Sequence, residues 1–425
     1  MHASHVPLGW SAPFALLLLA IAVLPLAAGH WWEHNRNKGI VCALLAAPVA
    51  WWTATAMPHA LQHAGLEYVS FILLLGSLFV VSGGLLLTGD LRARPGVNTA
   101  FLAVGAVLAN LVGTTGASML LIRPLLRTNA QREHVVHTVV FFVFVVCNTG
   151  GLLTPLGDPP LFMGFLRGVP FTWTFTLFPF WLGVNAALLT IYSVWDSRAI
   201  RRETRSDLRA DAASVEPLRL AGKRNLILLA AIVAAVAFAP PVWRESIMLA
   251  AALASLVATP RDVHARNRFA WGPIVEVAVL FAGIFVTMVP ALAWLEQNGT
   301  ALGVTSPRQF FWVTGVLSSF LDNTPTYVTF ASVATSLVNG AHPGAGITPD
   351  ALGRLLDFPE GEPLLRAISL GAVLMGANTY IGNGPNFMVK AIADASGVKT
   401  PAFFGYMLWS VGILLPVLAV VSIFV

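Results

Sequence analysis

The chain is a succession of long apolar stretches separated by short polar loops. A helix needs about 20 apolar residues to cross a bilayer, so the pattern predicts about ten transmembrane spans. They are Trp10–Ala28, Ile40–Met57, Tyr68–Leu87, Val136–Arg167, Thr174–Val194, Asn225–Pro240, Glu245–Thr259, Trp271–Trp294, Leu365–Ala395 and Pro401–Val425. We therefore expect an all-α polytopic membrane protein.

Two further apolar stretches, residues 98–126 and 309–338, are interrupted half-way by small and polar residues. We predict that each is a re-entrant hairpin, which enters and leaves the membrane on the same side. This topology satisfies the positive-inside rule, because the loops that it places inside hold most of the Lys and Arg residues. The loops that it places outside hold only Arg244, Arg308 and Arg354.

The same topology divides the chain into two halves of opposite orientation. Residues 1–195 form the first inverted repeat and residues 225–425 the second, with residues 196–224 as a charged cytoplasmic linker. Each half has five spans, and its hairpin lies between the third and the fourth span. The fourth spans, about 136–167 and 365–395, are predicted to be broken helices. Inverted repeats and broken helices are typical of secondary transporters.

The composition indicates that most of the protein surface contacts lipid. The chain is 56% hydrophobic and 11% charged, whereas soluble domains carry about 25% charged residues. Its basic excess lies in short loops between spans, which is a feature of membrane topology and does not indicate nucleic acid. We expect a multi-pass protein of a bacterial-type inner (cytoplasmic) membrane.

The strongest signal for a site is an internal match between the two fourth spans. Thr154–Met163 aligns without gaps on Thr379–Met388, 225 residues later, and Asp158 faces Asn383. Gly and Pro in mid-span break a helix, and bare backbone at that depth is tolerated only inside protein or beside a water-filled cavity. A carboxylate there is costly and usually functional. The alternative is a proline kink with a snorkelling Asp158.

The hairpin tips are the second signal. Asn110–Ser118 and Ser318–Thr326 place small hydroxyl residues where each apolar stretch reverses. Helix ends at such a tip aim their partial charges at a site. Asp322 either caps the helix after it or serves as a ligand, and the two roles are compatible.

The candidate ion- or substrate-binding residues come from the tips and the breaks. They are Thr114, Thr115, Ser118, Asn148, Thr154, Gly157, Asp158, Asp322, Asn323, Thr324, Asn378, Thr379, Gly382 and Asn383. Hard cations prefer oxygen ligands, so Asp158 and Asp322 are the proposed Na⁺ ligands. We expect no cofactor apart from Na⁺ as the transported or coupling ion.

Other charged residues within the spans give weaker signals. Arg123 and Arg167 lie near hairpin or helix ends, where long side chains snorkel to the surface. The same is expected of Glu276. Lys390 either faces a carboxylate or reaches the inner surface.

The chain pairs a broken helix with a hairpin that has small polar residues at its tip, and it does so twice. This arrangement resembles that of the ion transporter superfamily. That group includes citrate and dicarboxylate carriers, arsenite permeases and NhaD-type sodium/proton antiporters. Asn148–Asp158 and Leu321–Pro325 look like segments of the NhaD-type and related citrate/proton antiporter branch. The Ser-Asn-Thr tips of the dicarboxylate carriers are absent. The resemblance implies inverted repeats, a midplane site, elevator-type alternating access and a homodimer.

Two fixed carboxylates repel an anion in a low dielectric and suit a small cation or a proton. We therefore predict a secondary active transporter, specifically a sodium/proton antiporter. The alternative is a Na⁺- or H⁺-coupled citrate, dicarboxylate or arsenite-like anion carrier, because a bound cation neutralises one Asp. An ion channel is a more distant alternative.

An enzyme is not expected. The pairs His59/His63 and Glu133/His137 have the spacing of metal or acid–base pairs, but neither has a third ligand at suitable spacing.

Overall fold

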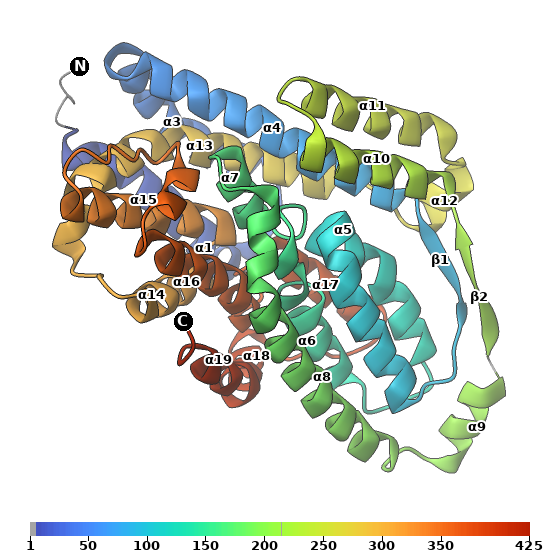
Figure 1. The fold of residues 1–425 in the computed structure, drawn as a ribbon. Coiled ribbons are helices and arrows are strands. Elements are labelled where there is room, and N and C mark those ends of the chain that lie inside the picture. Colours follow the sequence, from blue (N-terminus) through green and yellow to red (C-terminus); the bar gives the residue numbers. More distant parts are fainter. Residues whose placement is uncertain (1–5, 214) are drawn as a thin grey trace.

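The computed structural model describes residues 6–213 and 215–425 and is almost entirely helical (Figure 1). In this described part, eight helices are long and apolar enough to cross a membrane. They are Leu8–Ala27, Asn35–Ala56, Pro58–Gly83, Pro95–Thr128, Val136–Leu153, Phe171–Ile200, Gly272–Leu302 and Phe403–Val421. All but one overlap a predicted span, and the exception, Pro95–Thr128, is the first predicted hairpin. The chain is thus a polytopic membrane protein.

The helices carry the labels of Figure 1. In residues 6–213 they are α1 (Ala12–Ala27), α2 (Gly29–Trp32), α3 (Asn35–Ala56), α4 (Pro58–Gly83), α5 (Pro95–Thr128), α6 (Val136–Val145), α7 (Pro159–Leu166), α8 (Phe178–Ile200) and α9 (Arg205–Ala213). In residues 215–425 they are α10 (Arg224–Phe238), α11 (Trp243–Ala258), α12 (Arg261–Arg266), α13 (Gly272–Asn298), α14 (Pro307–Ser318), α15 (Asn323–Ala341), α16 (Gly361–Met375), α17 (Gly384–Ala395), α18 (Phe403–Trp409) and α19 (Leu415–Val421).

The long helices form two groups. In Figure 1, α4, α10, α11 and α13 run side by side along the top, and α1 and α3 pack against α13. The rings of Phe71 in α4 and Phe281 in α13 stack 4.7 Å apart, and Lys38 in α3 pairs with Glu276 in α13 at 2.6 Å. The first hairpin, both broken helices and the second hairpin form the other group beneath. We call them the upper and the lower group.

Both predicted hairpins fold back on themselves. Helix α5 is interrupted at Gly113, whose φ of 75° and ψ of 158° are non-helical. The side chains of Asn98 and Asn129 exchange hydrogen bonds of 2.9 Å, although a straight helix would hold them about 46 Å apart. Helices α14 and α15 likewise bring the rings of Phe310 and Phe330 to 6.4 Å. The position of these reversals in a membrane remains a prediction.

Both fourth spans are broken. In the first, α6 is followed by a 3-10 turn (Thr149–Leu153) and then by extended backbone, before α7 begins. In the second, α16 gives way to a 3-10 turn (Gly376–Asn378) and then to α17. The first break requires glycine, because a Cβ on Gly157 would lie 2.1 Å from the carbonyl oxygen of Gly151.

The segment 196–224, interpreted from the sequence as a linker, is folded. Helix α8 continues into it, α9 follows, and β2 (Glu216–Ala221) pairs antiparallel with β1 (Leu86–Asp90). The carboxylate of Asp211 accepts the backbone N–H of Ala93 at 3.1 Å. The sequence predicted an all-α chain, whereas the structure also contains a two-stranded β-ribbon. Local pattern did not predict it, because each strand is short and its only partner is far away in sequence.

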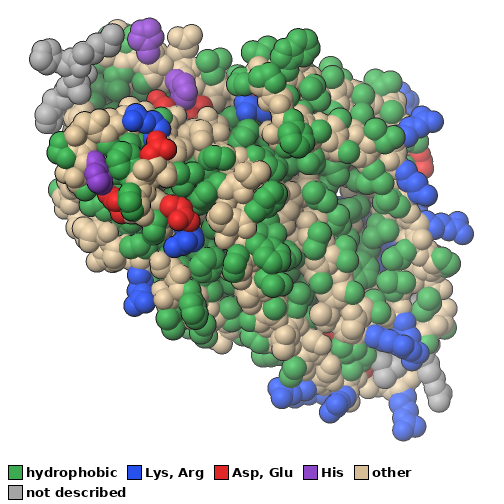
Figure 2. Space-filling model, viewed as in Figure 1, with side chains coloured by type: hydrophobic (Ala, Val, Ile, Leu, Met, Phe, Trp, Pro, Cys, Tyr) green, Lys and Arg blue, Asp and Glu red, His purple; other side chains and the backbone are tan. Residues whose placement is uncertain are grey.

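Charge is distributed unevenly over the surface. Figure 2 shows Lys and Arg gathered along the right and lower edges, where Figure 1 has β1, β2 and α9. Asp, Glu and His are more frequent at the left end. We call the first region the basic end.

Candidate functional site

The site is built around Asp158, whose side chain is completely buried. Its carboxylate accepts hydrogen bonds from Thr114 Oγ1 at 3.2 Å, Asn323 Nδ2 at 2.7 Å and Asn383 Nδ2 at 3.1 Å. The donors belong to the first hairpin, the second hairpin and the second helix break. All four interrupted elements predicted from the sequence therefore meet at one carboxylate.

Each of these residues stands at the N-terminus of a helix. Asp158 directly precedes α7, Asn383 directly precedes α17, Asn323 opens α15, and Thr114 follows the break in α5. A helix N-terminus carries a partial charge of about half a proton and binds anions with its free N–H groups. The site therefore combines one fixed negative charge with several partial positive charges.

A chain of asparagines joins the two breaks. Asn383 Nδ2 also lies 3.1 Å from the carbonyl oxygen of Cys147 and 3.2 Å from Asn148 Oδ1. Asn148 donates to Asn386 Oδ1 at 2.8 Å, and Asn386 donates to the carbonyl of Thr379 at 2.9 Å. Asn386 was not among the predicted residues. The internal match gave no signal for it, because it occupies the position of an apolar leucine in the first half.

Each helix break forms a hydrogen bond with the hairpin of its own half, and the two bonds correspond. Thr154 Oγ1 donates to the carbonyl of Asn110 at 2.5 Å, and Thr379, 225 residues later, donates to the carbonyl of Ser319. Asn378 Nδ2 adds a bond of 2.9 Å to Ser319 Oγ. Asn110 and Ser319 were not predicted, although both lie in the hairpin tips that the sequence singled out.

Asp322 is half-buried and caps α15, because its Oδ1 accepts the N–H of Thr324 at 3.0 Å. It lies close enough to Asp158 for the two charges to interact. The hydroxyl of Thr324 is buried and has no hydrogen-bond partner among the described residues. The capping role is therefore observed, and the ligand role remains a prediction.

The remaining predicted residues divide into two sets. The carbonyl of Gly157 accepts the N–H of Thr114 at 2.9 Å, and the N–H of Gly382 bonds to the hydroxyl of Thr379 at 3.1 Å, so both glycines shape the breaks. Ser118 instead places its hydroxyl 3.1 Å from the thiol of Cys147. Thr115 is half-buried beside Thr114.

Cationic side chains lie elsewhere. Arg167, expected to snorkel, is buried, and it binds the Glu67 carboxylate with Nε at 3.0 Å and Nη2 at 2.8 Å. Lys390 pairs with Asp394 at 2.5 Å. Within the described residues, no Lys or Arg forms an ion pair with Asp158 or Asp322. The site's carboxylates are thus held by neutral donors.

The His59/His63 pair gains a partner that sequence spacing could not reveal. Asp350, from the loop after α15, lies 3.6 Å from His63, and the ligand atoms of His63, Glu67 and Asp350 fall within 4.8 Å of one another. Both oxygens of Glu67 are bound by Arg167. A metal ion would face a guanidinium there, so we assign no metal site.

A multi-pass helical chain in which two broken helices meet at a buried carboxylate has the architecture of a secondary membrane transporter. A comparison with protein families supports this class, because the family model described as "Putative citrate transport" matches residues 3–425. The chain belongs to this family. It is accordingly a transporter and not an enzyme. No curated protein matched the sequence.

Proposed function

We propose that the chain carries citrate or a similar small carboxylate together with a coupling cation, H⁺ or Na⁺. The observation that favours this most is the meeting of four helix N-termini at Asp158. N-termini and amide donors attract the carboxylate groups of a substrate, and a buried carboxylate with oxygen neighbours suits a hard cation or a proton. The family description favours the same substrate class.

Coupling follows from electrostatics. An anion entering beside an ionised Asp158 is repelled strongly in a low dielectric. A proton or Na⁺ at the carboxylate removes this repulsion, so cation and anion bind best together. Asp322 and the hydroxyls of Thr114 and Thr324 are the additional oxygen ligands that we propose for Na⁺ among the candidates.

The movement proposed is alternating access, in which the lower helix group moves relative to the upper group. Two inverted repeats, residues 1–195 and 225–425, each with a re-entrant hairpin, contribute helices to both groups. The corresponding bonds of Thr154 and Thr379 support the repeats. The basic end of Figure 2 would face the cytoplasm of a bacterial-type inner membrane by the positive-inside rule.

Proteoliposome flux tests the proposal. Radiolabelled citrate should enter in response to a pH or Na⁺ gradient, and Asp158→Asn should abolish the gradient dependence. Asp262→Asn, an exposed change on α12, is the matched control and should transport normally. Gradient-driven citrate uptake that persists in Asp158→Asn would exclude this role of Asp158.

A sodium/proton antiporter is the second candidate. It is favoured by the two neighbouring carboxylates, Asp158 and Asp322, without a bonded Lys or Arg in the described structure. Competition of Na⁺ and H⁺ for Asp158 is sufficient for exchange. A pH dye inside the vesicles separates the candidates, because an antiporter moves protons on addition of Na⁺ alone, without any organic anion.

A further inference from the structure

A cavity of about 970 Å³ opens at the basic end. Its walls come from the second arm of α5, the start of α6, the segment after α12, and α17 with the loop that follows. A volume of this order accommodates a small-molecule ligand. The cavity was not indicated by any motif, because its lining residues are scattered over the chain.

The cavity is strongly cationic. Its Lys and Arg residues are Arg123, Arg127, Arg132, Arg266, Arg268 and Lys399, and Glu133 is its only acidic residue. Arg132 is neutralised by Asp196 and Glu203. Arg123, Arg266, Arg268 and Lys399 form no ion pair within the described part of the chain. Four unpaired positive charges therefore line a concave space in which Glu133 is the only acidic residue.

Arg123 and Arg268 are the most informative pair. Arg123 Nη1 is buried and has no hydrogen-bond partner among the described residues. Arg268 lies near enough for its charge to repel that of Arg123. A buried unsatisfied donor and two like charges are both unfavourable. An anion with two or more carboxylate groups in the cavity would offset both charges.

The cavity is lined by two of the helices that hold the site. The second arm of α5 starts at Thr114 and α17 starts after Asn383, the residues that hold Asp158, and α5 and α17 pack together. Met388, Ala391 and Ile392 of α17 line the cavity, so it begins along the same helix within two turns of the site. Concave walls of low dielectric focus the positive potential and raise the local concentration of anions.

We propose that this cavity is a capture vestibule, in which Arg123 and Arg268 bind a small di- or tricarboxylate on its path to or from Asp158. The inference rests on the proposed function, because it takes citrate as the cargo. An anionic lipid headgroup has similar chemistry and is distinguished by the experiments below.

Cysteine labelling in detergent tests the vestibule without requiring transport. Both native cysteines, Cys42 and Cys147, are buried, so Ser396→Cys on the cavity wall and Thr348→Cys on a distant exposed loop report selectively. Citrate should slow maleimide labelling of Ser396→Cys at least fivefold and leave Thr348→Cys unchanged. Adding Arg123→Gln and Arg268→Gln should remove the protection. Equal labelling with and without citrate would overturn the proposal.

The lipid alternative uses the same reporter. In vesicles of phosphatidylcholine alone, citrate should still protect Ser396→Cys, and replacing a third of the lipid by phosphatidylglycerol should not protect it without citrate. Protection by phosphatidylglycerol alone would assign the cavity to lipid and overturn the capture role.

Flux measurements link the vestibule to transport. In Arg123→Gln/Arg268→Gln, the KM for citrate should rise at least tenfold from the membrane side on which Ser396→Cys is labelled. The maximal rate and the Asp158-dependent cation coupling should stay within twofold of the parent. Arg261→Gln, an exposed change outside the cavity lining, should leave the KM unchanged. An unchanged KM in the double variant would refute capture.

Citrate protection without any citrate flux would uphold the cavity as an anion site and refute only the proposed function.

Discussion

Asp158 is held by two amides and a hydroxyl, and none of these donors carries a charge. Neutral donors fix the orientation of a carboxylate without cancelling its charge, whereas a bonded Lys or Arg would cancel it. The charge of Asp158 thus remains available to a mobile cation. This is why the surroundings of the carboxylate, and not its burial alone, favour a coupling role.

Asn323→Ala tests the shortest of these contacts. The variant removes the 2.7 Å bond to Asp158 and the oxygen that accepts Ser318 Oγ at 2.6 Å. Loss of a hydrogen bond to a charged group costs about 1.5–3 kcal/mol, so flux should fall at least tenfold. The control is Thr329→Ala, whose hydroxyl bonds only within α15, and it should keep flux within twofold. Equal flux in both variants would contradict a positioning role for Asn323.

Gly157→Ala tests the geometry of the first break. The new methyl group would lie 2.1 Å from the carbonyl oxygen of Gly151, which no side-chain movement can relieve. We expect little folded protein in detergent, measured by size-exclusion chromatography. The control is Gly183→Ala on α8, which has open space around it and should gain about 0.5–1 kcal/mol in helix stability. Normal yield of Gly157→Ala would show that the break can widen.

The sequence allowed part of this site to be predicted. Asp158 and Asn383 were found because the two breaks match each other residue by residue. Asn386 was missed because its counterpart is Leu161, so the match concealed its polarity. The role of Ser118 stays a prediction, since its hydroxyl contacts the thiol of Cys147 and the side of a hairpin arm that faces the site depends on the helix rotation after Gly113.

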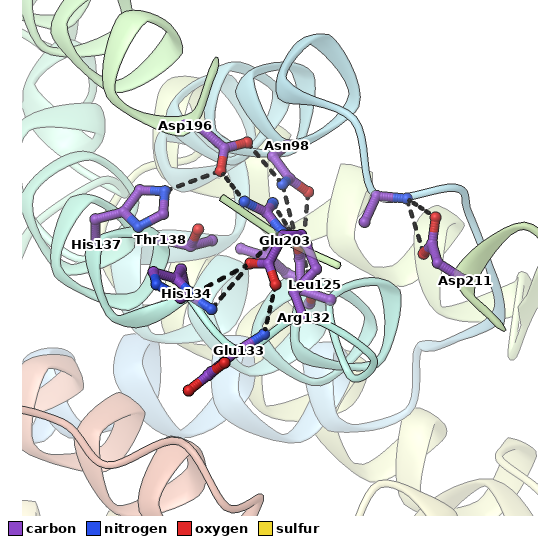
Figure 3. Close-up of polar contacts among 12 residues, drawn as sticks. Asn98, Leu125, Arg132, Glu133, His134, His137, Thr138, Asp196, Glu203 and Asp211 are labelled. Atoms are coloured by element: carbon purple, nitrogen blue, oxygen red, sulfur yellow. Dashed lines mark hydrogen bonds and ion pairs between the residues drawn. The ribbon is translucent and has the colours of Figure 1, made fainter. Parts of the chain in front are cut away.

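At the scale of elements, a buried polar cluster joins α5, α6 and α8 at the basic end (Figure 3). Asp196 lies at its centre and accepts hydrogen bonds from Arg132 at 2.7 Å, His137 at 2.8 Å and Asn98 at 3.0 Å. Glu203, just beyond α8, accepts the backbone N–H groups of residues 133 and 134. The cluster thereby holds the two ends of the first hairpin against the start of the broken helix.

Asp196→Asn should loosen these elements. The substitution leaves Arg132 without its closest counter-charge in a buried position, and such a loss costs about 3–5 kcal/mol. We expect a lower midpoint in detergent-denaturant titrations followed by circular dichroism. Asp262→Asn removes an exposed carboxylate and serves as the comparison. If both variants unfold at the same denaturant concentration, the cluster does not stabilise the packing of α5, α6 and α8.

Elements were predictable where one physical rule dominated. Continuous apolar runs located the spans, because bilayer thickness sets their length. The ribbon of β1 and β2 and the docking of α9 were not predictable, since they depend on contacts between residues 118 or more positions apart, such as Ala93 and Asp211. The elements in residues 196–213 and 215–224 were therefore missed, and the role of this segment as a linker between the halves stays a prediction.

On the scale of the whole molecule, the buried ion pair of Arg167 and Glu67 connects the two helix groups. Glu67 belongs to α4 of the upper group, and Arg167 ends α7 of the lower group. Arg167 Nη1 also donates to the carbonyl of Pro349 at 3.1 Å, which ties the loop after α15 to the same contact. Alternating access by relative movement of the groups would have to break these bonds.

Glu67→Gln should therefore shift the balance between conformations. In the present conformation the variant leaves the Arg167 guanidinium buried without a counter-charge, at a cost of about 3–5 kcal/mol, whereas a conformation that exposes Arg167 to water avoids this cost. Because the present conformation has the basic-end cavity open, we expect slower maleimide labelling of Ser396→Cys in the Glu67→Gln background. Glu362→Gln, which alters a half-buried pair with Arg366, should not change the labelling rate. If the Glu67→Gln protein stays folded and its Ser396→Cys is labelled at the parent rate, Glu67 and Arg167 belong to one rigid body. The two moving parts would then meet at another place in the molecule.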